Sequence, residues 1–344
     1  MNSIEKIKIR KSRWTELLKS DGTINRIFLI DVENYIPVRP LLWKDKKQER
    51  LDWILKKYSI QLEMLEWLED DKIPFLDMLT GTEIFAECFG CKISYPKDNT
   101  PFALSAISSS EDALKMKKPK LEDTPLMFLF DMADELKKRA GNDVVFRLPD
   151  IQSPMDIVAL IWDKNDFYIA LLEEPDAVKY LSGLVRDLMI EFLDEWFLRY
   201  GKEFIADFPD YYMPEGVCLS VDEIGVINEK MFNEYFMPEI SYISNHYGSL
   251  GVHCCANAHH QWKNFKEVPH LKLLNLVQPN NILIEAYDYF SSHCAQMHCW
   301  NSDDPVWTWF DHMPHNSRTA LQITVSNANE AKIAAEKLNK VCGR

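Results

Sequence analysis

The sequence predicts an α/β protein, a (β/α)8 (TIM) barrel over residues 71–344 that follows a mainly helical extension over residues 1–70. Three observations favour this fold class. Beyond residue 70, short apolar segments alternate with amphipathic helical segments, which is typical of parallel βαβ units. The chain has only 11 glycines and no GxGxxG or GxxxxGK[ST] turn, which disfavours a nucleotide-binding open sheet. Polar residues recur at the carboxyl ends of several predicted strands, where a barrel assembles its site.

The first 70 residues carry mainly helical signals. In residues 48–69, leucine, isoleucine and tyrosine side chains recur at spacings of three and four, as on the buried face of a helix. The apolar residues 26–30 predict one early strand. That strand ends before Pro37 and Pro40, which favour extended backbone in the residues before them. We expect this extension to pack on the barrel.

The remaining elements alternate along the chain. The predicted strands are residues 144–148, 217–221, 250–255, 271–277, 295–300 and 320–325. The predicted helices are residues 126–138, 175–200, 228–246, 258–265 and 328–341.

Composition excludes several classes of protein. Hydrophobic residues make up 47% of the chain, enough for a large core, and 39 basic against 53 acidic residues give a net charge of −14. This charge argues against a general nucleic-acid binder and against docking on an anionic membrane. The sequence has neither an apolar run of the ~20 residues that span a membrane nor a secretory signal. We therefore expect a cytoplasmic protein with its cysteines as thiols.

Histidine and cysteine gather in one part of the chain. All nine histidines lie between His246 and His315, together with four of the eight cysteines. In the strand at 250–255, alternation directs His253 and Cys255 to the same face, about 6–7 Å apart. That spacing suits two ligands of a tetrahedral zinc ion. The alternative is a buried histidine bonded to backbone beside an inert thiol.

A third ligand would come from another strand. In residues 293–300, alternation places Cys294, Gln296, His298 and Trp300 on the more polar face, which we expect to point inward. His298 is nearest the carboxyl end of the strand and is the preferred third ligand, ahead of Cys294, and both are ahead of Cys299. Gln296 and Trp300 are expected to contact substrate, with core packing as the alternative for Trp300. A shift of one residue in register would reverse the two faces.

Acidic residues follow the strand at 217–221. Asp222 and Glu223 lie at its carboxyl end, where a carboxylate serves as a general acid or base or holds a cationic ligand. The alternative for Asp222 is to cap the next helix.

Further polar residues are candidates for contacts with substrate. Arg147, Asp150 and Gln152 follow another strand, and Arg147 is expected to bind a carboxylate, with solvation at the surface as the alternative. Tyr212 is expected at the rim of the site, with simple packing as the alternative, and Asn257, two residues after Cys255, is expected to contact substrate.

Taken together, these segments resemble the uroporphyrinogen decarboxylase superfamily. The similarity is carried by residues 80–90, 148–158, 219–238 and 251–262, and it extends in order over about residues 70–340. The fold of that superfamily is a (β/α)8 barrel, which agrees with the fold predicted from alternation.

The resemblance implies two chemistries. True decarboxylases hold the carboxylates of a tetrapyrrole with an N-terminal Arg-Gln-Ala-Gly-Arg loop, which this chain lacks, since Arg39 is its nearest arginine and is not equivalent. Cobalamin-dependent methyltransferases bind zinc through His-x-Cys and a later cysteine. Their zinc lowers the pKa of a substrate thiol, and the thiolate attacks a methyl-corrinoid.

The methyltransferase branch implies that His253 and Cys255 bind zinc and that a partner corrinoid protein carries methylcobalamin. The later cysteine is missing, because this chain has Gln322, Thr324 and Ser326 in that region. His298 or Cys294 would have to replace it.

Three functions remain open. The first is a zinc-dependent methyltransferase acting on a small molecule with a corrinoid protein. The second is a metal-free decarboxylase or lyase that uses Asp222 and Arg147. The third is a ligand-binding barrel without catalysis.

Overall fold

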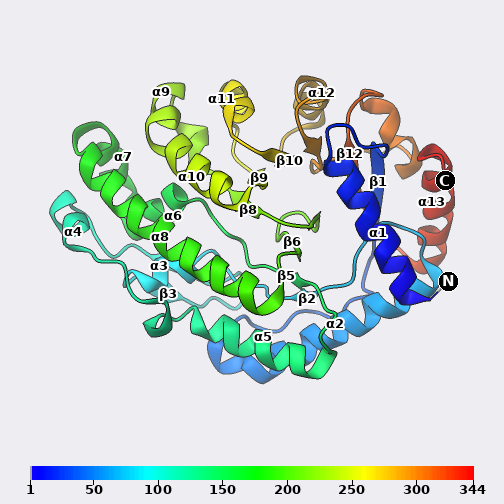
Figure 1. Cartoon of the computed structure of the whole chain (residues 1–344), viewed down its shortest axis with the longest axis horizontal. Helices are drawn as coiled ribbons and strands as arrows, with labels where there is room; N and C mark the ends of the chain where they lie inside the picture. The colour runs from blue at the N-terminus through cyan, green and yellow to red at the C-terminus, as the bar shows by residue number, and fades with distance from the viewer. Residues whose placement is uncertain (1) are drawn as a thin grey trace.

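A ring of mainly parallel strands forms the centre of the molecule, and helices surround it (Figure 1). The computed structural model describes residues 2–344. Six parallel strands form the larger sheet, in the order β1 (Arg26–Val32), β12 (Thr319–Val325), β11 (Ala295–Gln296), β10 (Leu271–Leu276), β9 (Leu250–Cys254) and β8 (Val217–Ser220).

A smaller sheet completes the ring. It contains β2 (Leu76–Asp77), β5 (Phe146–Arg147), β6 (Phe204–Ile205) and the antiparallel β7 (Tyr212–Met213). At one seam, Gln152 forms a parallel bridge with Ser220 of β8. At the other seam, the Asp71 N–H donates to the Phe28 carbonyl at 2.9 Å, and the Asp70 carboxylate accepts the Ile30 N–H at 3.0 Å. These bonds connect the two sheets through the segments that precede β2 and follow β5, and the arrangement is that of the predicted (β/α)8 barrel.

Helices cover the outside of the strands. They are α1 (Ser3–Leu18), α2 (Lys47–Trp67), α3 (Ile84–Cys88), α4 (Ser110–Lys115), α5 (Met127–Ala140), α6 (Pro154–Ile161), α7 (Lys164–Glu173), α8 (Pro175–Tyr200), α9 (Glu229–Met231), α10 (Met237–Tyr247), α11 (Trp262–Glu267), α12 (Asn280–Tyr289) and α13 (Ala328–Val341). A short hairpin, β3 (Lys92–Ser94) and β4 (Phe102–Leu104), projects from the segment after α3. Within residues 2–344, no helix has the length and apolar character needed to cross a membrane.

The first 70 residues do more than form a helical extension. β1 pairs with β12 along its whole length, from Arg26 opposite Thr319 to Val32 opposite Val325, and most of its side chains are buried. The predicted boundary at residue 70 therefore has no counterpart in the sheet, because a strand of the barrel comes from this region. α1 packs on the turn that follows α2, where the Trp14 Nε1–H donates to the Asp71 carbonyl at 3.0 Å.

The ends of two helices position the neighbouring strands β8 and β9. α6 begins with Pro154 after Ser153, whose hydroxyl accepts the Asp156 N–H, so the first turn of this helix is held next to the end of β8. α10 ends at Gly248, whose φ of 73° closes the helix and turns the chain into β9.

Candidate metal centre

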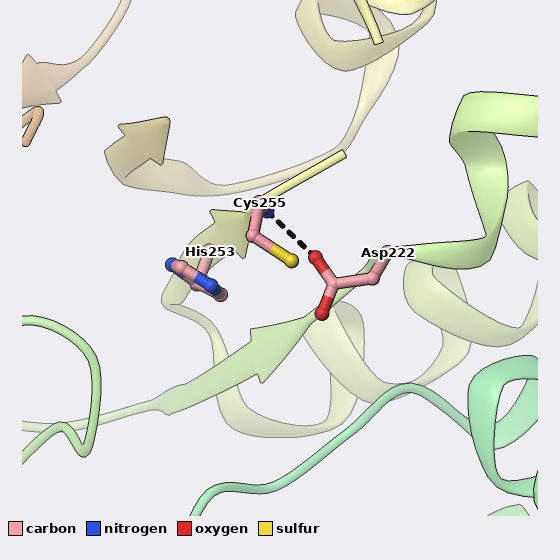
Figure 2. A group of neighbouring side chains, drawn as sticks. All are labelled: Asp222, His253 and Cys255. Carbon is pink, nitrogen blue, oxygen red and sulfur yellow. Dashed lines mark hydrogen bonds between the residues drawn. The ribbon is translucent and has the colours of Figure 1, made fainter. Parts of the chain in front are cut away.

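Three side chains of metal-binding type converge at the carboxyl ends of two neighbouring strands (Figure 2). Asp222 follows β8, His253 lies on β9, and Cys255 comes directly after β9. One ligand atom of each lies within 4.8 Å of those of the other two. Nitrogen, sulfur and oxygen are the donor types that zinc accepts.

Strand register brings these residues together. Ser220 of β8 pairs with His253 of β9, so Asp222 and Cys255 each lie two residues beyond that pair. Because side chains alternate along a strand, His253 and Cys255 share one face, whereas Val252 and Cys254 are fully buried on the other.

Three hydrogen bonds from backbone N–H groups hold Asp222 in place. Its Oδ1 accepts the Cys255 N–H at 2.7 Å, which ties the end of β8 to the end of β9 (Figure 2). The buried Asp156 of α6 accepts the N–H groups of Asp222 and Glu223, both at 2.8 Å. Burial, together with the nearby Asp222 charge, raises the pKa of Asp156 to about 7.

The second ring nitrogen of His253 contacts the neighbouring strand. Its Nδ1 lies 2.5 Å from Oδ1 of Asn275, on β10. The ring of Phe208 lies beside the ring of His253, with 5.1 Å between the ring centroids. Within the described residues, no hydrogen bond to the Nε2 of His253 is present, so this atom is available to a ligand.

The thiol of Cys255 is protonated in the absence of a cation. Partial burial and the Asp222 carboxylate raise its pKa to about 12. A dication among the three side chains would favour the thiolate and the carboxylate over their protonated forms. Cys255 is exposed, so the centre is open to solvent on its side. The donor set and this open side fit a zinc ion of the catalytic type, which has three protein ligands and one open position.

The other two predicted metal ligands lie elsewhere. His298 is fully engaged within the protein, because its Nδ1 accepts the Leu276 N–H at 3.0 Å and its Nε2 contacts Oε1 of Gln296 at 2.9 Å. Burial lowers the pKa of His298 to about 3, so its ring is neutral. Cys294 is fully buried before the start of β11, and burial raises its pKa to about 12. Asp222 takes the place expected for these residues.

Gln296 and His298 face the helices and not the inside of the barrel. The His298 ring contacts the ring of Tyr287 on α12, with the centroids 4.6 Å apart, and Gln296 donates to the Tyr287 carbonyl at 3.1 Å. Both side chains therefore occupy the layer between the sheet and its helices. The prediction that the more polar face of residues 293–300 points inward is therefore wrong. These two polar side chains satisfy each other outside the barrel instead. Cys299, which ranked last, has its Sγ 4.0 Å from Nδ2 of Asn275.

Arg147 belongs to a buried ion cluster. Its guanidinium contacts the carboxylates of Asp77 at 3.2 Å, Asp207 at 2.5 Å and Asp210 at 3.1 Å. Lys57 also contacts Asp77, at 2.6 Å. The charge of Arg147 is thus already compensated by aspartates of the protein and is not available to the expected substrate carboxylate.

Asp150 and Gln152 lie between this cluster and the metal centre. Oδ1 of Asp150 accepts the Ser220 hydroxyl at 2.5 Å, and burial raises the pKa of the Asp150 carboxyl. Gln152 forms the strand bridge with Ser220. Asp150 is the predicted substrate contact that the structure places beside the centre.

The remaining predicted residues are dispersed. Glu223 accepts the Tyr168 hydroxyl at 2.5 Å and pairs with Lys164, both on α7, so it faces away from the centre. The Tyr212 hydroxyl donates to Glu203 at 2.7 Å, and Glu203 lies just before β6. The hydroxyl therefore lies towards the amino end of β6, and the predicted position of Tyr212 at the rim of the site is wrong. Asn257 is exposed. Trp300 is buried and stacks on His312, with ring centroids 5.3 Å apart.

Sequence reasoning missed several residues around the site. Asn275 is the single polar side chain among Leu273, Leu274 and Leu276, and an isolated amide in an apolar strand is the signal that could have revealed it. Asp77 ends an apolar strand in the same way as Asp222. Asp207 and Asp210 lie in the turn between β6 and β7, where no pattern indicated a function.

Comparisons with known proteins agree with this architecture. The family model described as uroporphyrinogen decarboxylase (URO-D) matches residues 60–282, and the chain therefore belongs to this family. Among solved structures, the fold is similar to that of a methyltransferase from Methanosarcina mazei, with a TM-score of 0.70 and 9% sequence identity over 96% of this chain and 98% of the other. At this identity, the likeness concerns the fold. No curated protein sequence matches the chain.

Proposed function

We propose that this member of the uroporphyrinogen decarboxylase family is a zinc-dependent methyltransferase that transfers a methyl group from a corrinoid protein to a small-molecule thiol. The observation that carries the proposal is the convergence of Asp222, His253 and Cys255 at the carboxyl ends of β8 and β9. Zinc bound there would supply Lewis acidity, which lowers the pKa of a substrate thiol towards neutrality.

The protein's own residues have distinct roles in this proposal. His253 would bind the metal through its Nε2, Cys255 through its Sγ, and Asp222 through its carboxylate. The same carboxylate accepts the backbone N–H of Cys255 and so orients that residue. Two anionic ligands and one neutral ligand compensate the two charges of a zinc ion. Asp156 keeps Asp222 in place through the backbone N–H groups of the turn after β8.

Asp222 as the third ligand distinguishes this site from the His, Cys and Cys set that the family resemblance implies. Carboxylate oxygen is a harder donor than thiolate sulfur, so we expect weaker zinc binding than at a site with two thiolates. The expected benefit is a more electrophilic metal, because one thiolate donates less charge than two.

The alternative of a metal-free decarboxylase is less well supported. It needs a cation to hold the substrate carboxylate, and the guanidinium of Arg147 already faces three aspartates.

The eight cysteines are all free thiols, which fits a reducing compartment, and we place the protein in the cytoplasm.

Metal analysis of the purified chain tests the proposal. We expect about one zinc per chain in wild type, and its loss in His253→Ala, Cys255→Ser and Asp222→Asn. His259→Ala and Cys342→Ser, outside the cluster, are matched controls and should keep the metal. Zinc-loaded wild type should then methylate a thiol with methylcobalamin as donor, and the three variants should not. Wild type that stays metal-free after zinc is supplied would overturn the proposal.

A further inference from the structure

A row of polar side chains crosses three neighbouring strands at the level of the metal centre. Ser220, His253 and Asn275 are register partners on β8, β9 and β10, so their side chains leave the sheet on the same face. His253 is 6% exposed and Asn275 is fully buried. A buried amide in an apolar strand needs hydrogen-bond partners for both its oxygen and its nitrogen.

The orientation of the Asn275 amide follows from its second contact. Its Nδ2 donates to the backbone carbonyl of Met297, which follows β11. A flipped amide would place two oxygens against each other at that point. Oδ1 therefore faces His253 as an acceptor, and the Nδ1 of His253, 2.5 Å away, must carry the proton.

The tautomer of His253 decides whether it can bind a metal at the centre. With the proton on Nδ1, the lone pair is on Nε2, the nitrogen that has no hydrogen-bond partner within residues 2–344. With the proton on Nε2, the same ring would present an N–H instead of a ligand. Metal-binding histidines commonly donate their other N–H to a protein acceptor, which fixes both the tautomer and the ring orientation.

We propose that Asn275 is the positioning residue that sets the tautomer and orientation of His253 for metal binding, an inference that rests on the proposed function of the same centre. An amide does this without adding charge. The two anions, Asp222 and Cys255, then balance a dication, whereas a carboxylate behind His253 would leave the centre net negative.

Asn275 also ties β10 to the segment after β11, so a purely structural role must be separated from positioning. Asn275→Asp keeps an acceptor for His253 but loses the donor to Met297. Asn275→Leu loses both groups at similar size. Asn264→Leu is the matched control, because Asn264 is 4% exposed and hydrogen-bonded to Gln261 and Asn233, none of them in the metal cluster.

Zinc affinity, measured by competition with a chelating dye, should separate the two roles. We expect Asn275→Leu to bind zinc about 10–100-fold more weakly than wild type, as for other losses of a contact behind a metal ligand. Asn275→Asp should retain most of the affinity, and Asn264→Leu all of it. Equal losses in Asn275→Asp and Asn275→Leu, or no loss in Asn275→Leu, would overturn the proposal. If Asn275→Leu does not fold, Asn275→Ser, whose side chain is too short to reach His253, replaces it.

Nitrogen NMR of metal-free protein gives a readout that does not depend on zinc. Wild type and Asn275→Asp should show His253 protonated at Nδ1, and Asn275→Leu should show a mixture of tautomers. If wild type binds no zinc but these tautomers are found, the proposed function fails, and the inference that Asn275 sets the tautomer of His253 stands. If wild type binds zinc and His253 is protonated at Nε2, the inference about Asn275 alone fails.

Discussion

Two polar regions lie side by side at the carboxyl ends of the strands, and they differ in how completely their charges are satisfied. In the Arg147 cluster, one guanidinium faces three aspartates and Lys57 supports one of them, so the groups satisfy each other. In the metal centre, two potential anions and an imidazole converge with no cation among them. A satisfied ion cluster holds the barrel together, whereas an unsatisfied ligand set is available to bind something else.

Removal of Arg147 should give the largest effect on stability. Arg147→Ala leaves three aspartates facing one another in a buried region, and we expect a loss of about 3–5 kcal/mol in the free energy of unfolding. Urea denaturation measures this free energy. Arg139, which forms an exposed ion pair with Asp52, provides the control: Arg139→Ala should change the free energy of unfolding by less than about 1 kcal/mol. Unchanged stability in Arg147→Ala would mean that the cluster is not structural and that Arg147 is free for a ligand.

Cys255 should react slowly in metal-free protein. Its pKa of about 12 leaves far less thiolate at pH 8 than an ordinary cysteine with a pKa near 8.5. We expect alkylation by iodoacetamide at the Cys255 peptide to be at least ten times slower than in an unfolded control. Asp222→Asn removes the neighbouring charge and should speed the reaction. A wild-type rate equal to that of the unfolded chain would contradict the electrostatics of the centre.

Asp207 should make stability depend on pH. Burial raises its pKa to about 7 in the folded protein, above the ordinary value near 4. The folded state thus holds a proton that the unfolded state releases, so this contribution is present below about pH 4 and is lost as pH rises towards 7. The difference between these two pKa values corresponds to at most about 4 kcal/mol of unfolding free energy, and we expect a flatter profile in Asp207→Asn. Asp77 contributes in the opposite direction, with stability lost as pH falls, because Arg147 and Lys57 hold its pKa below the usual range despite burial. A wild-type profile identical to that of Asp207→Asn would refute the assignment.

Glu223 should contribute least. It pairs with Lys164 and Tyr168 near the surface, so Glu223→Gln should cost less than about 1 kcal/mol of unfolding free energy and leave zinc content unchanged. Calorimetry and metal analysis check both. A loss of zinc in this variant would bring Glu223 back into the site, next to Asp222.

Features that depend on local sequence patterns could be predicted better than features that depend on contacts between distant segments. Alternation along residues 250–255 placed His253 and Cys255 on one face, because this depends only on the geometry of a single strand. Alternation also groups Gln296 and His298 on one face of residues 293–300, but their polarity does not mark the inner face, because the two side chains bond to each other outside the barrel.

Contacts between distant segments could not be derived from one sequence. Asp222 was identified as a functional residue, but its place beside His253 and Cys255 depends on the register of β8 against β9. Arg147 was expected to bind substrate because its partners Asp207 and Asp210 come from a turn some 60 residues later. The early strand at 26–30 was predicted, but its pairing with β12 joins the two ends of the chain.

The most direct test of the central claim is zinc-edge X-ray absorption on zinc-loaded protein. The account predicts one sulfur neighbour at about 2.3 Å and the remaining neighbours nitrogen or oxygen at about 2.0–2.2 Å, with loss of bound zinc in Asp222→Asn. Two or more sulfur neighbours, or zinc bound equally well by Asp222→Asn, would contradict a centre built from Asp222, His253 and Cys255.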